Sequence, residues 1–126
     1  MKKIANFQIK DSGKREKYKS GMVRDVTDGK IDFSLIFDGP MYKRWANHLT
    51  RGAIKYNKRN WMKASGQQEL DRFLESSARH FYQWITGETD EDHAAAIFFN
   101  INSAEYVKEK MKNQLSANQP NKRTIL

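Results

Sequence analysis

The chain has 126 residues, of which 38% are hydrophobic and 30% are charged, and it contains no cysteine. A chain of this length forms one domain with a modest core, so we expect a single domain over residues 1–126. The lack of cysteine excludes disulfides, thiolate metal sites and a cysteine nucleophile. The formal net charge of +8 favours phosphate-bearing partners. No apolar run is long enough to span a bilayer, so we expect a soluble cytoplasmic protein without a membrane partner.

The first 37 residues are typical of extended structure. The Asp28-Gly29 pair suits a tight hairpin turn, and apolar and polar residues alternate behind it at Ile31, Phe33, Leu35 and Phe37. A short strand around Phe7 and Ile9 is expected to join them. Residues 11–20 are polar and basic, and we expect this segment to be mobile.

Two helices are predicted in the middle of the chain. The first begins after Asp38-Gly39-Pro40, since Asp accepts from free amides and Pro suits the first turn; Gly52 is a place where it can end. The second runs from Gln67 to near Gly87. Its apolar stripe has spacings of three and four and comprises Leu70, Phe73, Leu74, Ser77, Phe81, Trp84 and Ile85.

A third helix is expected from His93 to about Leu115. The spacing of Thr89 and Asp92 resembles a capping box at its start. Its first half is apolar nearly all round and is expected to be buried, and a flexible tail near 116–126 follows. The predicted fold is therefore α+β and mostly α, with a small N-terminal antiparallel sheet packed on about three helices.

Charge is partitioned along the chain. Residues 41–63 carry seven cations without one acidic residue, and set Trp45, Tyr56 and Trp61 among them. The charged residues of segment 64–93 are mainly acidic. A basic, aromatic segment of this kind suits phosphates and a nucleotide base, although a solvated loop anchored by its aromatic rings fits the pattern as well. Its candidate ligand contacts are Arg51, Lys55, Tyr56, Lys58, Arg59 and Asn60.

Further candidates lie on the second and third helices. Arg79 and Tyr82 share one face, and Phe81 is either a stacking ring or part of the apolar stripe. The acidic turn Glu88–His93 is able either to hold a divalent metal or to compensate the helix dipole. Asn100, Lys108 and Lys112 lie farther along the third helix, where a core or solvent role competes with ligand binding. The candidates in these segments are Arg79, Phe81, Tyr82, Glu91, Asp92, His93, Asn100, Lys108 and Lys112.

Several separated motifs together resemble a known group of small phage proteins. These motifs are Lys10–Arg15, Gly21–Asp25, Gly29-Lys30, Gly52–Tyr56, Arg59–Trp61, Arg79-His80, Asp90–His93 and Asn100. The group is often labelled dATP/dGTP diphosphohydrolase-like. The pattern is also similar to the first family of Thoeris anti-defence proteins, which are phage sponges for cyclic ADP-ribose isomers made by a bacterial TIR enzyme.

The resemblance implies a homo-oligomer, either a dimer or a hexamer of dimers, in the cytoplasm of the infected host. It would bind an anionic nucleotide signal between subunits without cleaving it, and some relatives also hold cyclic oligonucleotides at a second site. Contacts to adenine, ribose and pyrophosphate would fall on Phe81, on the Asp90–His93 turn, and on Lys108 and Lys112. No catalytic residue, metal or cofactor is expected, and no stable nucleic-acid polymer as partner.

The alternative is a MazG-like, magnesium-dependent dATP/dGTP pyrophosphohydrolase. MazG-type enzymes use Glu-x-x-Glu followed by Glu-x-x-Asp, whereas this chain has Glu88-x-x-Glu91 and no following Glu-x-x-Asp. Half of the magnesium ligands are therefore missing. The residues left for such an enzyme are Glu75, Glu88, Asp92 and His93. A third hypothesis, a basic nucleic-acid binder, predicts affinity that grows with polymer length and falls with salt.

Overall fold

The computed structural model describes residues 6–118. By its internal contacts the chain divides into two compact units, Met1–Phe33 and Ser34–Leu126. Much of the tail expected near 116–126 lies outside the described residues, and Ser116 to Asn118 still belong to the last helix. No helix within the described range is long and apolar enough to cross a membrane.

The N-terminal unit contains a two-stranded antiparallel sheet. Strand β1 (Arg15–Lys17) pairs with β2 (Val23–Asp25), with Arg15 opposite Asp25. The Arg15 guanidinium also lies 2.8 Å from Asp11, and this contact lowers the pKa of Asp11 to about 2. The segment 11–20, expected to be mobile, thus contributes one of the strands.

The position of the hairpin was predicted wrongly. The chain reverses between β1 and β2 around Gly21, whose φ of +92° suits glycine, whereas Asp28-Gly29 forms a separate turn in which Lys30 donates to Thr27. Phe7 and Ile9 are exposed and lie in no strand. Within the described residues the sheet therefore consists of two strands of three residues each.

The alternating segment after that turn is a 3₁₀-helix, η1 (Phe33–Phe37), and not a strand. Its apolar side chains remain exposed. Backbone N–H and C=O groups need partners, and in the absence of a neighbouring strand local bonds supply them, such as Asp38 N–H to the Leu35 carbonyl at 3.3 Å.

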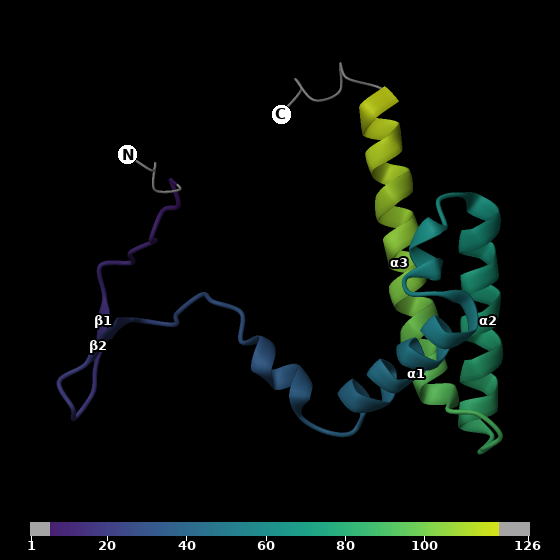
Figure 1. Cartoon of the computed structure of the whole chain (residues 1–126), viewed down its shortest axis with the longest axis horizontal. Helices are drawn as coiled ribbons and strands as arrows, with labels where there is room; N and C mark the ends of the chain where they lie inside the picture. The colour runs from purple at the N-terminus through teal and green to yellow at the C-terminus, as the bar shows by residue number, and fades with distance from the viewer. Residues whose placement is uncertain (1–5, 119–126) are drawn as a thin grey trace. The chain divides into compact units, whose positions relative to one another are not determined.

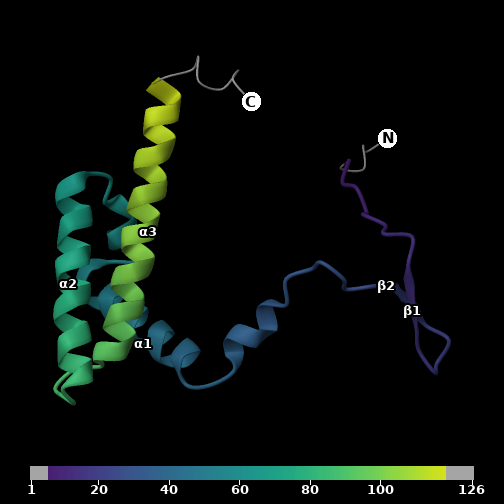
Figure 2. The ribbon, with the colours of Figure 1, turned by 180° about the vertical axis from the view of Figure 1, so that it is seen from behind.

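Three α-helices follow, as predicted: α1 (Met41–Tyr56), α2 (Gln67–Ile85) and α3 (His93–Asn118), with a short 3₁₀-helix, η2 (Asn60–Lys63), between the first two. The α+β, mostly α class is confirmed. Figures 1 and 2 show α2 and α3 side by side, with α1 against the end at which α3 begins. Two local expectations were wrong: no side chain caps α1, and α1 continues through Gly52.

The core lies between α2 and α3. Ala64, Leu70, Ala104 and Val107 form a buried cluster, against which Phe73 and Met111 pack. The expectation that the first half of α3 is buried is only partly correct: His93 to Ala96, Asn100, Ser103 and Ala104 are buried, whereas Phe98 and Ile101 are exposed. The predicted stripe of α2 is only partly correct. His80, which is not part of that stripe, faces α3 because it bonds to His93. Four apolar members of the stripe are instead exposed, namely Leu74, Phe81, Trp84 and Ile85.

Helix α1 is held to the start of α3 by an ion pair. Arg44 donates from Nε and Nη2 to the two Asp92 oxygens at 2.9 and 2.6 Å. Asp92 also accepts from the Ala95 N–H at 3.1 Å, so Asp92 itself caps α3 instead of completing a capping box with Thr89. The Arg44 contact lowers the pKa of Asp92 to about 2.

We expect Arg44→Gln to lower the free energy of unfolding by about 1 kcal/mol at neutral pH, because it removes a two-point contact between helices. Since the pKa of Asp92 falls from 3.8 to about 2 on folding, this stabilisation is complete above the unfolded value. It disappears as the pH drops from 3.8 through about 2. Denaturant titrations of both proteins at neutral and acidic pH measure it.

The matched control is Arg72→Gln. Arg72 pairs with Glu75 across one turn of α2, and both side chains are mainly exposed, so its removal should change stability by a few tenths of a kcal/mol at most. Equal losses in the two variants, or a loss in Arg44→Gln that persists unchanged at low pH, would contradict the assignment.

Candidate functional site

A hollow of about 620 Å³ opens where the end of α1 and η2 face the α2–α3 pair. We call it the Trp61 hollow. Its walls combine aromatic rings, amides and two cations, and none of the described residues that line it carries a carboxylate. The lining consists of His48, Leu49, Thr50, Gly52, Ala53, Tyr56, Asn57, Lys58, Arg59, Asn60, Trp61, Met62, Phe73 and Phe99.

The turn that forms one wall has an unusual backbone. Asn57 has φ 81° and ψ 156°, a region that residues other than glycine rarely adopt, and Arg59 is left-handed with φ 61°. Such conformations cost roughly 1–3 kcal/mol each and concentrate at functional sites. The following helix η2 is fixed to α3, because Lys110 Nζ donates to the Met62 and Ala64 carbonyls at 2.9 and 3.2 Å.

The hollow gathers four of the predicted contacts, namely Tyr56, Lys58, Arg59 and Asn60. Trp61 is half-buried and meets Phe99 and Tyr106 edge-on, with ring centroids 6.5 and 5.2 Å apart. It therefore packs as an anchor and also lines the hollow, and stacking of a base on it stays a prediction. Two of the six contacts predicted in the basic segment lie outside the lining, namely Arg51 and Lys55. The Lys55 ammonium lies over the Tyr56 ring, 4.9 Å from its centroid.

Sequence reasoning missed the contributions of other helices to this hollow. Phe73 and Phe99 belonged to apolar patterns that predict only core positions. His48 lies on α1, and burial lowers its pKa, with Arg51 adding to the effect while Asp92 and Glu91 oppose it. The acidic turn therefore acts electrostatically on a side chain that lines the Trp61 hollow.

Lys108 and Lys112 line a second hollow of about 540 Å³, to which Trp61 also contributes. Glu105 and Glu109 line it too, and Lys108 lies 3.6 Å from Glu105 in an exposed pair. Positive and negative side chains are balanced there, so an anion gains less than in the Trp61 hollow.

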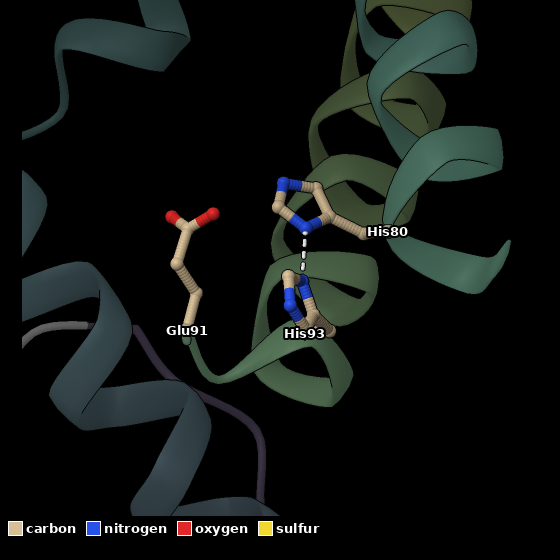
Figure 3. Close-up of side chains that lie close together, drawn as sticks. All are labelled: His80, Glu91 and His93. Atoms are coloured by element: carbon tan, nitrogen blue, oxygen red, sulfur yellow. Dashed lines mark hydrogen bonds between the residues drawn. The ribbon is translucent and has the colours of Figure 1, made fainter. Parts of the chain in front are cut away.

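Two buried histidines meet at the acidic turn. The Nδ1 atoms of His80 on α2 and His93 on α3 are 2.9 Å apart. Figure 3 marks this contact with a dashed line and shows the Glu91 side chain beside the two rings. His93 Nε2 lies 2.7 Å from Asp90, and this contact lowers the pKa of Asp90. Burial is the main cause that lowers the pKa of His80. The sequence placed His93 in this turn but gave no sign that His80 faces it.

The remaining candidates have simpler surroundings. Phe81 is 51% exposed, and its ring contacts that of Trp84, with the centroids 6.0 Å apart. Tyr82 is also exposed, and Arg79 lies at the surface near Ser76. Asn100 is buried and donates to the Ala96 carbonyl at 2.8 Å within α3, so its amide is engaged in its own helix.

Two groups of candidates are therefore well separated within one chain. His93 and Lys108 are fifteen positions apart on the straight helix α3, which corresponds to about 22 Å at 1.5 Å per residue. A compact nucleotide cannot touch the acidic turn and these lysines of the same chain together.

The comparisons with known proteins give one match. The family model described as dATP/dGTP diphosphohydrolase, N-terminal, matches residues 20–115, which include α1, α2 and most of α3. Searches of curated proteins and of solved structures found no significant match.

Gly52 provides a test of the hollow. It lies inside α1 and lines the hollow, and a Cβ added there would meet nothing within 4 Å. Since glycine in a helix interior is less stable than alanine by roughly 0.5–1 kcal/mol, we expect Gly52→Ala to raise the free energy of unfolding by that amount. Thermal and urea unfolding measure the change, and a destabilised variant would show that the hollow closes around this position.

Proposed function

We propose that this chain, which belongs to the dATP/dGTP diphosphohydrolase N-terminal family, binds a small purine nucleotide and retains it without hydrolysis. In this proposal it is a phage anti-defence sponge for a nucleotide immune signal such as a cyclic ADP-ribose isomer. The observation that carries the proposal is the Trp61 hollow, which offers rings, amides and cations without a carboxylate in its described lining.

Each part of the hollow matches a part of such a ligand. Its volume of about 620 Å³ falls in the range of small-molecule sites. Tyr56 and Trp61 provide flat surfaces for a purine, and stacking of one base is worth about 1–3 kcal/mol. Lys58 and Arg59 supply positive charge for phosphates, and the arginine offers a two-pronged donor.

The arrangement of carboxylates argues against magnesium-dependent hydrolysis. Divalent ions that activate a phosphoanhydride need several oxygen ligands around them. Of the four residues proposed for that reaction, Glu75 pairs with Arg72, Asp92 with Arg44 and His93 with Asp90. Within residues 6–118, the one group of at least three metal-ligand side chains contains a single carboxylate.

The acidic turn and Lys108 of one chain are too far apart along α3 to contact the same nucleotide. If the acidic turn and Lys108 contact the same nucleotide, they must come from two subunits, because about 22 Å divides them in one chain. The exposed apolar side chains of α2 and α3 also favour self-association; they include Phe81, Trp84, Ile85, Phe98 and Ile101. We therefore propose a homo-oligomer.

Retention without cleavage is tested by release on heating. The full chain is incubated with a cyclic ADP-ribose isomer, freed of unbound ligand and heat-denatured, and the supernatant is analysed by mass spectrometry. We expect intact ligand in stoichiometric amount. A cleaved product, or no retained ligand across a panel of cyclic ADP-ribose isomers and cyclic oligonucleotides, overturns the sponge proposal.

The family description favours a second candidate, a dATP/dGTP diphosphohydrolase. Incubation with dATP or dGTP in the presence of Mg²⁺, Mn²⁺ or Zn²⁺ separates the two, because the enzyme releases pyrophosphate and the sponge does not. In a third arm, the affinity of the protein is measured for a series of DNA duplexes of increasing length. Affinity that rises with length and falls steeply with salt would indicate a nucleic-acid binder.

Arg59→Ala tests whether the Trp61 hollow is the binding site. The variant removes one phosphate-binding guanidinium, and we expect at least a tenfold loss of affinity for the retained nucleotide, measured by calorimetry. Arg72→Ala removes the same charge from an exposed position of α2 outside the lining and should leave the affinity within about twofold. Equal losses would mean that only net charge matters.

A further inference from the structure

We propose that His80, Glu91 and His93 form a binding site for a borderline transition-metal ion of the Zn²⁺ class. One nitrogen of each imidazole and one carboxylate oxygen of Glu91 all lie within 4.8 Å of one another. The three side chains come from α2, from the turn and from the first residue of α3, and they point toward a common space in Figure 3. Imidazole nitrogen and carboxylate oxygen are the ligand atoms that Zn²⁺ takes in proteins with three protein ligands.

Asp90 prepares His93 for this role. It lies 2.7 Å from His93 Nε2, so Nε2 carries the proton and Nδ1 keeps its lone pair. A carboxylate that accepts from the far nitrogen of an imidazole is the usual outer support of a metal-bound histidine. The lone pair of His93 is thereby directed at His80.

The two rings are already spaced for a shared ion. Their Nδ1 atoms are 2.9 Å apart, and without a metal one proton lies between them. At metal–nitrogen distances of about 2.0–2.1 Å, tetrahedral ligands lie about 3.3 Å apart. The rings need to separate by only roughly 0.4 Å, and the proton between them moves from His80 Nδ1 to His80 Nε2 when the ion enters, so that each ring keeps one N–H.

Burial and ligand type select the ion. His80 and His93 are 8% and 2% exposed, so the two imidazoles are shielded from solvent, and the negative charge comes from Asp90 and Glu91. Mg²⁺ and Ca²⁺ prefer oxygen ligands and retain water, whereas Zn²⁺, Co²⁺ and Ni²⁺ favour imidazole. Glu91 is exposed, so its side chain is free to turn onto the ion. With three protein ligands, the fourth coordination position of the ion is left for water.

This inference goes beyond the proposed function, because it requires no nucleotide. An ion held by α2, the turn and α3 binds the folded chain only and so raises its stability by mass action. The first experiment uses tag-free full-length protein stripped with a chelator. We expect one Co²⁺ per chain with the intense visible absorption of a tetrahedral site, displaced by Zn²⁺, and a rise in Tm of several degrees with Zn²⁺ but none with Mg²⁺.

Two variants and two controls locate the ion. His80→Gln and Glu91→Gln should weaken Co²⁺ binding at least tenfold and reduce the Zn²⁺-dependent rise in Tm. His48→Gln, which alters the remaining histidine, and Glu88→Gln, which alters a nearby exposed carboxylate, should retain both. If His80→Gln fails to fold, the exposed Glu91→Gln and the wild-type Co²⁺ spectrum still decide the question.

The proposal is overturned if stripped wild-type protein gives no stoichiometric Co²⁺ spectrum, or if Mg²⁺ produces the same rise in Tm. It is also overturned if Glu91→Gln binds as tightly as its Glu88→Gln control. Because no nucleotide is present, failure here leaves the sponge proposal standing. Zn²⁺-dependent release of pyrophosphate would remove the sponge proposal and leave the metal site intact.

Discussion

The described helical unit depends on the close pairing of α2 with the first half of α3. This pairing is possible because α3 presents small side chains there, among them Ala96, Ser103 and Ala104, which are almost fully buried. Helices with small contact residues approach closely, but they bury little apolar volume. Larger buried side chains are few, notably Leu70 and Val107. The aromatic residues therefore lie around the helix pair, where they form the walls of hollows and the exposed faces.

The Trp61 hollow follows from the way α1 is fastened to this pair. Arg44 holds α1 to Asp92 at the start of α3, and Lys110 holds η2, which follows α1, to the middle of α3. Between these two attachments the helix forms one wall of the Trp61 hollow. His48 on the same wall is close enough to Glu91 for its pKa to respond to that carboxylate.

Periodicity in the sequence predicted the helices well, because a 3.6-residue repeat and the Asp-Gly-Pro and glycine boundaries are local signals. It failed for Phe33–Phe37, since an alternating pattern forms a strand only if another strand is available to pair with it. It also left Phe81 open between the apolar stripe and a stacking ring, because apolarity alone cannot reveal that His80 bonds to His93 while Phe81 stays exposed. The basic turn at Lys58 and Arg59 was found from charge and aromatic content, whereas His48, Phe73 and Phe99 reach the hollow only through tertiary packing.

The small core has a consequence for the proposed function. A chain that leaves Phe81, Trp84 and Ile85 more than half exposed on one helix gains stability when another surface covers them. Under the sponge proposal, the same association is needed to bring the acidic turn of one chain to the lysines of another, since about 22 Å of α3 separates them in a single chain. Self-association and capture of a shared nucleotide would then be one coupled equilibrium, in which ligand binding stabilises the oligomer and the oligomer raises the affinity for ligand.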